Sequence, residues 1–203
     1  YEFWYNSAVL SGMYSPQARF FMLKSLSEFF KRRLPARTEI FLAFSLAAFV
    51  IFTWSLRAFF FSIPAYLLSQ TPGEILVALS YMLAIALLET IFVTFSLVGL
   101  AIILPGGWLK DGFSYKASFF ILASAAIFIH LQYVLTNQPT VNFLLRELGF
   151  MLALWLIPTL LARYINVVRK IVLDILDRLT IFSYLYLPLG AISLVVVLIR
   201  LLW

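Results

Sequence analysis

The stretch from Ile75 to Leu104 constrains this chain most, because its thirty residues contain a single charged side chain, Glu89, close to the middle. At about 1.5 Å of rise per residue, a helix of this length crosses a hydrocarbon core of roughly 30 Å with length to spare. Glu89 then lies near the midplane of the bilayer. A carboxylate at that depth costs a few kcal/mol unless it is protonated, paired or hydrated. We therefore expect neighbouring helices to shelter Glu89, and any site to lie in that shelter.

The composition of the whole chain agrees with a membrane location. Hydrophobic residues make up 64% of the sequence and charged residues 12%, whereas roughly a quarter of the residues of soluble domains are charged. We predict an integral, multi-pass, all-α membrane protein. Cysteine is absent, which excludes disulfides, thiolate metal sites and cysteine nucleophiles.

Hydropathy divides the sequence into an N-terminal segment, residues 1–38, and a membrane domain, residues 39–203. The domain has room for about five transmembrane helices with short connections. The predicted spans are approximately 39–61, 75–104, 117–135, 143–162 and 181–203.

Two further stretches predict basic amphipathic helices at the membrane surface. Residues 19–34 and 163–179 alternate apolar and charged side chains at steps of three and four residues. The first is interpreted as a helix in the headgroup plane, with a docking helix for a partner as the alternative. The second lies flat on the membrane or extends from it.

The distribution of basic residues predicts the orientation. Five spans put twelve of the fifteen lysines and arginines on the side of the N-terminus, so the N-terminus is expected in the cytoplasm and the C-terminus outside a cell membrane. Anionic headgroups are the expected partners of this side. The side chains predicted to lie at the lipid headgroups are Lys24, Lys31, Arg32, Arg33, Trp108, Arg169, Lys170 and Trp203.

Glu89 and His130 form the candidate intramembrane polar pair. His130 is the only histidine, and counting residues through its span puts it slightly beyond the midplane, at nearly the depth of Glu89. A hydrogen bond between the two is geometrically possible if their spans pack together. Arg57 is a possible counter-ion for Glu89, although its position late in the first span also suits a side chain that reaches the far headgroups.

Familiar catalytic and metal-binding patterns are missing from the sequence. One histidine and one intramembrane glutamate supply two ligands, where zinc takes three or four, so no metal site is predicted. No G-x-S-x-G motif accompanies His130, and all lysines lie outside the spans, which argues against a serine hydrolase and a Schiff base. No basic surface rich in base-reading side chains remains for nucleic acid. We therefore predict no enzyme activity.

Three hypotheses for function stay open. The first is a non-catalytic membrane subunit or scaffold that packs against protein partners in a larger assembly or forms a homo-oligomer. The second is a small transporter or channel component that uses Glu89 and His130 as a proton or ion relay. The third is a pigment- or haem-binding membrane subunit that ligates haem or chlorophyll through His130. No other cofactor is expected.

Overall fold

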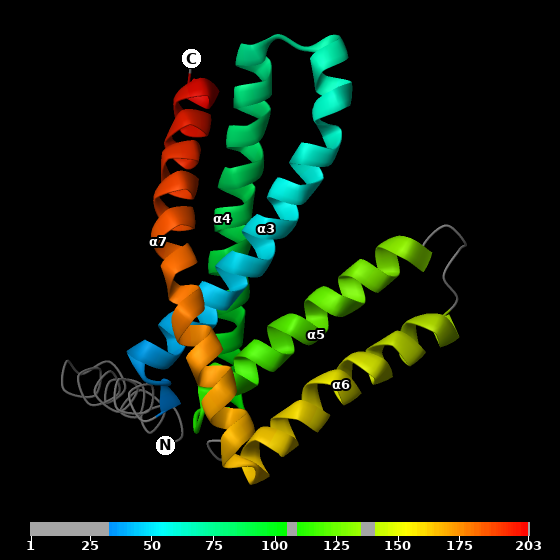
Figure 1. Ribbon diagram of the computed structural model, residues 1–203, viewed down its shortest axis with the longest axis vertical. Helices are drawn as coiled ribbons and strands as arrows, with labels where there is room; N and C mark the ends of the chain where they lie inside the picture. The colour runs from blue at the N-terminus through cyan, green and yellow to red at the C-terminus, as the bar shows by residue number, and fades with distance from the viewer. Residues whose placement is uncertain (1–32, 105–108, 135–140, 203) are drawn as a thin grey trace, which may run out of the picture.

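The computed structural model describes residues 33–104, 109–134 and 141–202, and the described chain is entirely helical apart from short connections and turns. The predicted all-α fold class is confirmed. The helices, labelled as in Figure 1, are α3 (Arg37–Ser69), α4 (Pro72–Ile103), α5 (Phe113–Val134), α6 (Val141–Tyr164) and α7 (Asn166–Leu202).

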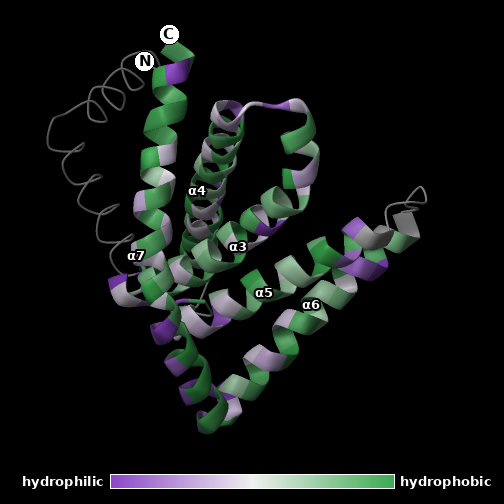
Figure 2. Cartoon of the chain, turned by 45° about the horizontal axis from the view of Figure 1, so that its top comes forward, coloured by the Kyte–Doolittle hydropathy of each residue, from purple (hydrophilic) through white to green (hydrophobic). Residues whose placement is uncertain are grey.

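All five helices are long and apolar enough to cross a membrane, which confirms a multi-pass membrane protein. Three of them are much longer than a bilayer requires: α3 has 33 residues, α4 has 32 and α7 has 37, whereas about 20 residues suffice. These three helices must tilt or extend beyond the hydrocarbon core. Figure 2 shows that hydrophobic residues line most of each helix, while hydrophilic residues concentrate toward the helix ends and along the first part of α7.

The helices form two parts. Helices α3, α4 and α7 pack on one another, and α5 and α6 form an antiparallel hairpin that diverges from them (Figure 1). The hairpin is joined to the rest where α5 contacts α3 and where α6 meets the beginning of α7. One end of the molecule therefore gathers the start of α3, the end of α4, the start of α5, and the junction of α6 with α7.

Helices α3, α4 and α7 approach one another closely at Gly190 of α7. A Cβ atom added there would lie 3.0 Å from Cβ of Leu87 on α4 and 3.0 Å from Cζ of Phe52 on α3. Phe52 in turn stacks on Tyr186, with ring centroids 4.9 Å apart and an interplanar angle of 11°. Glycine at residue 190 thus lets three helices share this space without a tight contact to a Cβ atom.

A buried polar contact joins α3 to α7 nearby. Ser183 donates a hydrogen bond to Oγ of Ser45 at 2.7 Å, and Ser45 donates to the backbone oxygen of Phe41 at 2.8 Å. Both serines are fully buried. A hydroxyl inside an apolar bundle needs such a partner, so this contact favours one register of α7 on α3.

The helix boundaries differ from the predicted spans in two places. The first span was predicted to end near residue 61, but α3 continues through Pro64 to Ser69. Neighbouring groups in a membrane helix can satisfy the carbonyl that a proline leaves unpaired. Helix α4 begins at Pro72, so the connection is only two residues long. Thr71 and Glu74 form a reciprocal capping box at this start.

The second difference is that residues 163–179 do not form a helix separate from the last span. The break in the chain falls at Ile165, and from Asn166 a single helix runs through Pro188 to Leu202. Residues 166–187 include no proline or glycine that would break the helix. The Thr180 hydroxyl donates a hydrogen bond to the Asp177 carbonyl within the helix. The charged first part of α7 is therefore an extension of the last membrane span.

Candidate functional site

Glu89 lies at the middle of α4, 17 residues after Pro72 and 14 before Ile103. The side of α4 that packs on α3 and α7 carries small and hydroxyl side chains, among them Ala86, Thr90 and Thr94. The two threonines satisfy their hydroxyls by donating to carbonyls one turn earlier, at 2.7 and 2.8 Å. Glu89 is adjacent in sequence to Thr90 but projects away from this packed side.

The Glu89 side chain is exposed on the outer surface of the bundle. Within the part of the chain that the structure describes, no side chain forms a hydrogen bond or an ion pair with it. Large exposed apolar residues surround it along α4 at steps of three and four residues. We call this surface the Glu89 face, and it consists of Tyr81, Ile85, Leu88, Glu89, Phe92, Phe95 and Ser96. The expected shelter for Glu89 does not come from the described helices.

The possible counter-ion Arg57 is not paired with Glu89. Arg57 is exposed on α3, and its guanidinium lies over the ring of Trp54, 5.1 Å from the ring centroid. Since these residues are three apart on one helix, the contact is local. No ion pair joins α3 and α4 at this depth among the described residues.

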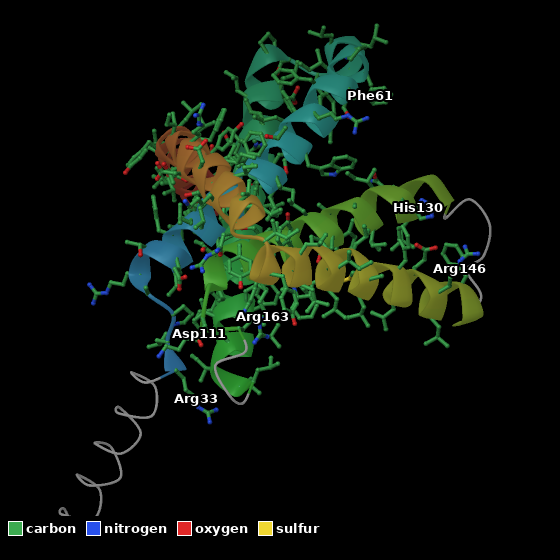
Figure 3. The ribbon with its side chains drawn as sticks, turned by 60° about the horizontal axis from the view of Figure 1, so that its bottom comes forward. Arg33, Phe61, Asp111, His130, Arg146 and Arg163 are labelled. Carbon is green, nitrogen blue, oxygen red and sulfur yellow. The ribbon has the colours of Figure 1, made fainter. Side chains whose placement is uncertain are left out.

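His130 is not brought to Glu89 either. It lies about one turn before the end of α5, and its Nε2 is 3.7 Å from Oε1 of Glu147 on α6. Figure 3 shows His130 and Arg146 together at the far end of the α5–α6 hairpin. Among the described residues, the acidic side chain that contacts His130 is therefore Glu147 and not Glu89.

Glu147 is the residue of this group that the sequence reasoning missed. Its side chain is 8% exposed, and Arg146 lies 3.4 Å from the same oxygen, Oε1, that faces His130. The second oxygen, Oε2, has no hydrogen-bond partner among the residues that the structure describes. The sequence spacing could have predicted this contact. In two antiparallel helices joined by a short loop, residues at similar distances from the loop lie opposite each other. His130 and Glu147 lie at similar distances on either side of residues 135–140.

The end of the molecule near the start of α3 carries most of the described basic residues. Arg33 donates a hydrogen bond to the carbonyl of Ile102 at 3.0 Å and so ties the chain before α3 to the end of α4. Arg169 and Lys170 are exposed at the start of α7. The other side chains predicted at the headgroups, Lys24, Lys31, Arg32, Trp108 and Trp203, lie outside the described residues, as do residues 19–32 of the helix predicted over 19–34.

A cavity of about 290 Å³ opens at this basic end, between the start of α5, the second half of α6 and the start of α7. Its charged lining residues are Asp111, Lys116, Arg163 and Arg169. Figure 3 shows Asp111 and Arg163 near each other at this end, far from His130. We call this cavity the basic pocket. Arg169 was predicted at the headgroups, but a cavity between these helices was not predicted.

No group of three or more histidine, aspartate or glutamate side chains with metal-site geometry occurs among the described residues. No protein-family model matches the chain, and neither a curated protein nor a solved structure matches it. The Glu89 face and the basic pocket are therefore interpreted from their own chemistry.

Proposed function

We propose that this chain is a non-catalytic membrane subunit that binds a transmembrane helix of another protein along the Glu89 face. The observation that carries this proposal is the exposed Glu89 side chain at mid-span, unpaired within the described chain and surrounded by exposed apolar residues. Against lipid, a carboxylate at this depth costs a few kcal/mol. A partner helix removes that cost if it supplies a hydrogen-bond donor or a cation.

Charge complementarity defines the partner. We infer a helix with a lysine, arginine, histidine or amide side chain at the depth of Glu89, flanked by residues small enough to pack against Phe92 and Phe95. A net hydrogen bond to a charged group contributes roughly 1.5–3 kcal/mol, and the apolar residues of the face add shape complementarity rather than a hydrophobic driving force.

A second copy of the chain is the less suitable occupant. In a two-fold dimer the same surface of each copy meets its equivalent, which would place Glu89 of one copy near Glu89 of the other. Two carboxylates in a region of low dielectric repel unless they share a proton. A different protein with a basic or amide side chain meets the requirement directly.

We propose that the basic end of the molecule faces the cytoplasm and that the C-terminus lies outside, because lysine and arginine are enriched on cytoplasmic connections. Arg37, Lys110, Arg163 and Arg169 support this orientation. The absence of native cysteine makes a direct test possible. In intact cells, Gln70→Cys should react with an impermeant maleimide and Asn166→Cys should not; the reverse pattern would contradict the orientation.

Native electrophoresis of the protein extracted from its own membranes in mild detergent tests the subunit proposal. We expect the unmodified chain to migrate in an assembly larger than a monomer and Glu89→Leu to lose that assembly. Glu89→Gln keeps the size and an acceptor but loses the charge, so we expect about tenfold weaker association, or 1.4 kcal/mol.

Asp177→Asn is the matched control, because it removes an exposed carboxylate from α7 away from α4. It should leave the assembly intact. An assembly that survives Glu89→Leu would show that the Glu89 face is not the binding surface. A complex containing only copies of this chain would contradict the inferred partner.

A further inference from the structure

We infer that the basic pocket binds the phosphate of an anionic phospholipid headgroup. The inference concerns a different surface from the Glu89 face and does not depend on the function proposed above. It rests on the charge of the pocket, on the contacts of two of its cations with an aromatic ring, and on the apolar surface that leads away from it.

The pocket has an excess of positive charge. Lys116, Arg163 and Arg169 line it together with one carboxylate, Asp111, so its formal charge is 3 − 1 = +2. Neither Arg163 nor Arg169 forms an ion pair with a carboxylate in the described chain. A phosphate group would receive charge-assisted hydrogen bonds from these guanidinium groups and reduce their mutual repulsion.

An aromatic side chain holds two of the cations in place. Tyr115 is 6% exposed, and its ring centroid lies 5.7 Å from Nζ of Lys116 and 5.7 Å from the guanidinium carbon of Arg169. Because α5 supplies the ring and α7 supplies Arg169, the contact positions cations from two helices around one cavity. The ligand then meets side chains that have already lost part of their conformational freedom.

The third wall of the pocket comes from α6 and is tied to α5. Trp155 donates a hydrogen bond from Nε1 to the backbone oxygen of Lys116 at 3.1 Å. Its indole also packs edge-on against Phe120, with centroids 5.7 Å apart. Tryptophan is common at the level of the headgroups, where one part of the ring is apolar and the other part is hydrogen-bonded.

The apolar lining of the pocket favours a lipid over a soluble phosphate. Leu156 and Leu160 line the pocket on α6. Leu152 and Leu148 extend the same row at intervals of four residues toward the other end of the helix, and both are exposed. An acyl chain attached to a phosphate in the pocket can therefore lie along this row within the hydrocarbon core.

Native mass spectrometry of the full-length protein in neutral detergent tests the inference. We expect a complex with one phosphatidylglycerol molecule that survives dissociation better than the complex with phosphatidylcholine, whose headgroup has no net charge. Arg163→Gln combined with Arg169→Gln should lower the fraction of protein with bound phosphatidylglycerol at least tenfold. Both side chains are exposed, so the fold should survive, and circular dichroism checks this.

Arg37→Gln combined with Arg178→Gln is the control, because it removes the same charge from two exposed side chains that do not line the pocket. This variant should bind phosphatidylglycerol like the unmodified protein. Arg163→Lys with Arg169→Lys should restore part of the binding, since the charge returns without the planar guanidinium. Equal losses in the two glutamine pairs would overturn the site, as would equal retention of the two lipids.

A competition arm separates a lipid from a soluble phosphate. Glycerol 3-phosphate at millimolar concentration should displace less than a tenth of the bound phosphatidylglycerol, because it lacks the acyl chains that contact the leucine row. Complete displacement by glycerol 3-phosphate or by inorganic phosphate at that concentration would assign the pocket to a soluble phosphate and overturn the lipid.

Discussion

Replacement of Gly190 by alanine tests the packing of α3, α4 and α7. The added Cβ would lie 3.0 Å from one carbon of Leu87 and 3.0 Å from one carbon of Phe52. Carbon atoms prefer separations of about 3.5–4.0 Å, so both contacts are short by roughly 0.5 Å or more. Neither neighbour can move easily, because the Leu87 atom is Cβ, next to the α4 backbone, and the Phe52 ring stacks on Tyr186.

The expected loss of stability follows from this overlap. Overfilling a well-packed core costs about 1–3 kcal/mol, whereas alanine gains up to about 1 kcal/mol over glycine in helix propensity. Gly99→Ala provides the matched control, since a Cβ at residue 99 on α4 meets nothing within 4 Å. The difference between the two variants removes the propensity effect and should equal the packing cost of about 1–3 kcal/mol.

The assay is reversible unfolding of the purified protein in mixed micelles, with sodium dodecyl sulfate as the denaturant and circular dichroism as the signal. Gly190→Ala should have a folding equilibrium constant roughly 5- to 150-fold lower than that of Gly99→Ala. Equal stability of the two variants would refute the close approach of the three helices at residue 190.

Substitutions also test three further contacts in the bundle. Ser45→Ala and Ser183→Ala, measured singly and together in the same unfolding assay, should give a coupling energy of about 0.6 kcal/mol and at most about 1.7 kcal/mol; additive effects would mean that the two hydroxyls do not interact. Thr71→Ala removes the capping box of α4 and should cost about 0.5–2 kcal/mol, whereas Thr71→Ser should cost little. Trp155→Phe removes the indole N–H that donates to the carbonyl of Lys116 and should cost about 0.5–1.5 kcal/mol; no loss of stability would contradict the link between α5 and α6.

The sequence predicts the membrane fold well because hydropathy depends on local composition. Five apolar stretches correspond to the five helices, and Ile75–Leu104 lies almost entirely within α4. The helix ends at Ser69 and Asn166 were harder to place, because Pro64 and the charged residues of 163–179 resemble boundaries. Inside a membrane bundle, proline and a change in polarity do not by themselves end a helix.

The candidate site depends on which way each side chain points around its helix, and hydropathy carries little of that information. Residue counting placed Glu89 at mid-span, but the packed side of α4 is marked by Ala86, Thr90 and Thr94. Thr90 is the next residue after Glu89 in the sequence, yet it points to a different side of the helix. These small residues indicate close helix contact, and Glu89 follows a different row. His130 was paired by depth with Glu89, whereas the short connection between α5 and α6 brings it to Glu147.

Site-directed cross-linking in native membranes tests the central proposal most directly, because the chain has no cysteine of its own. A short bifunctional cysteine reagent is attached to the Glu89 face at Ile85→Cys or Phe92→Cys. Ile192→Cys, on the exposed surface of α7, is the control. We predict that both α4 positions link to one transmembrane segment of another protein, that this segment has a basic or amide side chain at the same depth, and that Glu89→Leu abolishes the link. The assignment of the Glu89 face as a binding surface would be contradicted if the α4 and α7 positions cross-linked to protein equally well. Cross-links from the α4 positions to lipid alone would also contradict it.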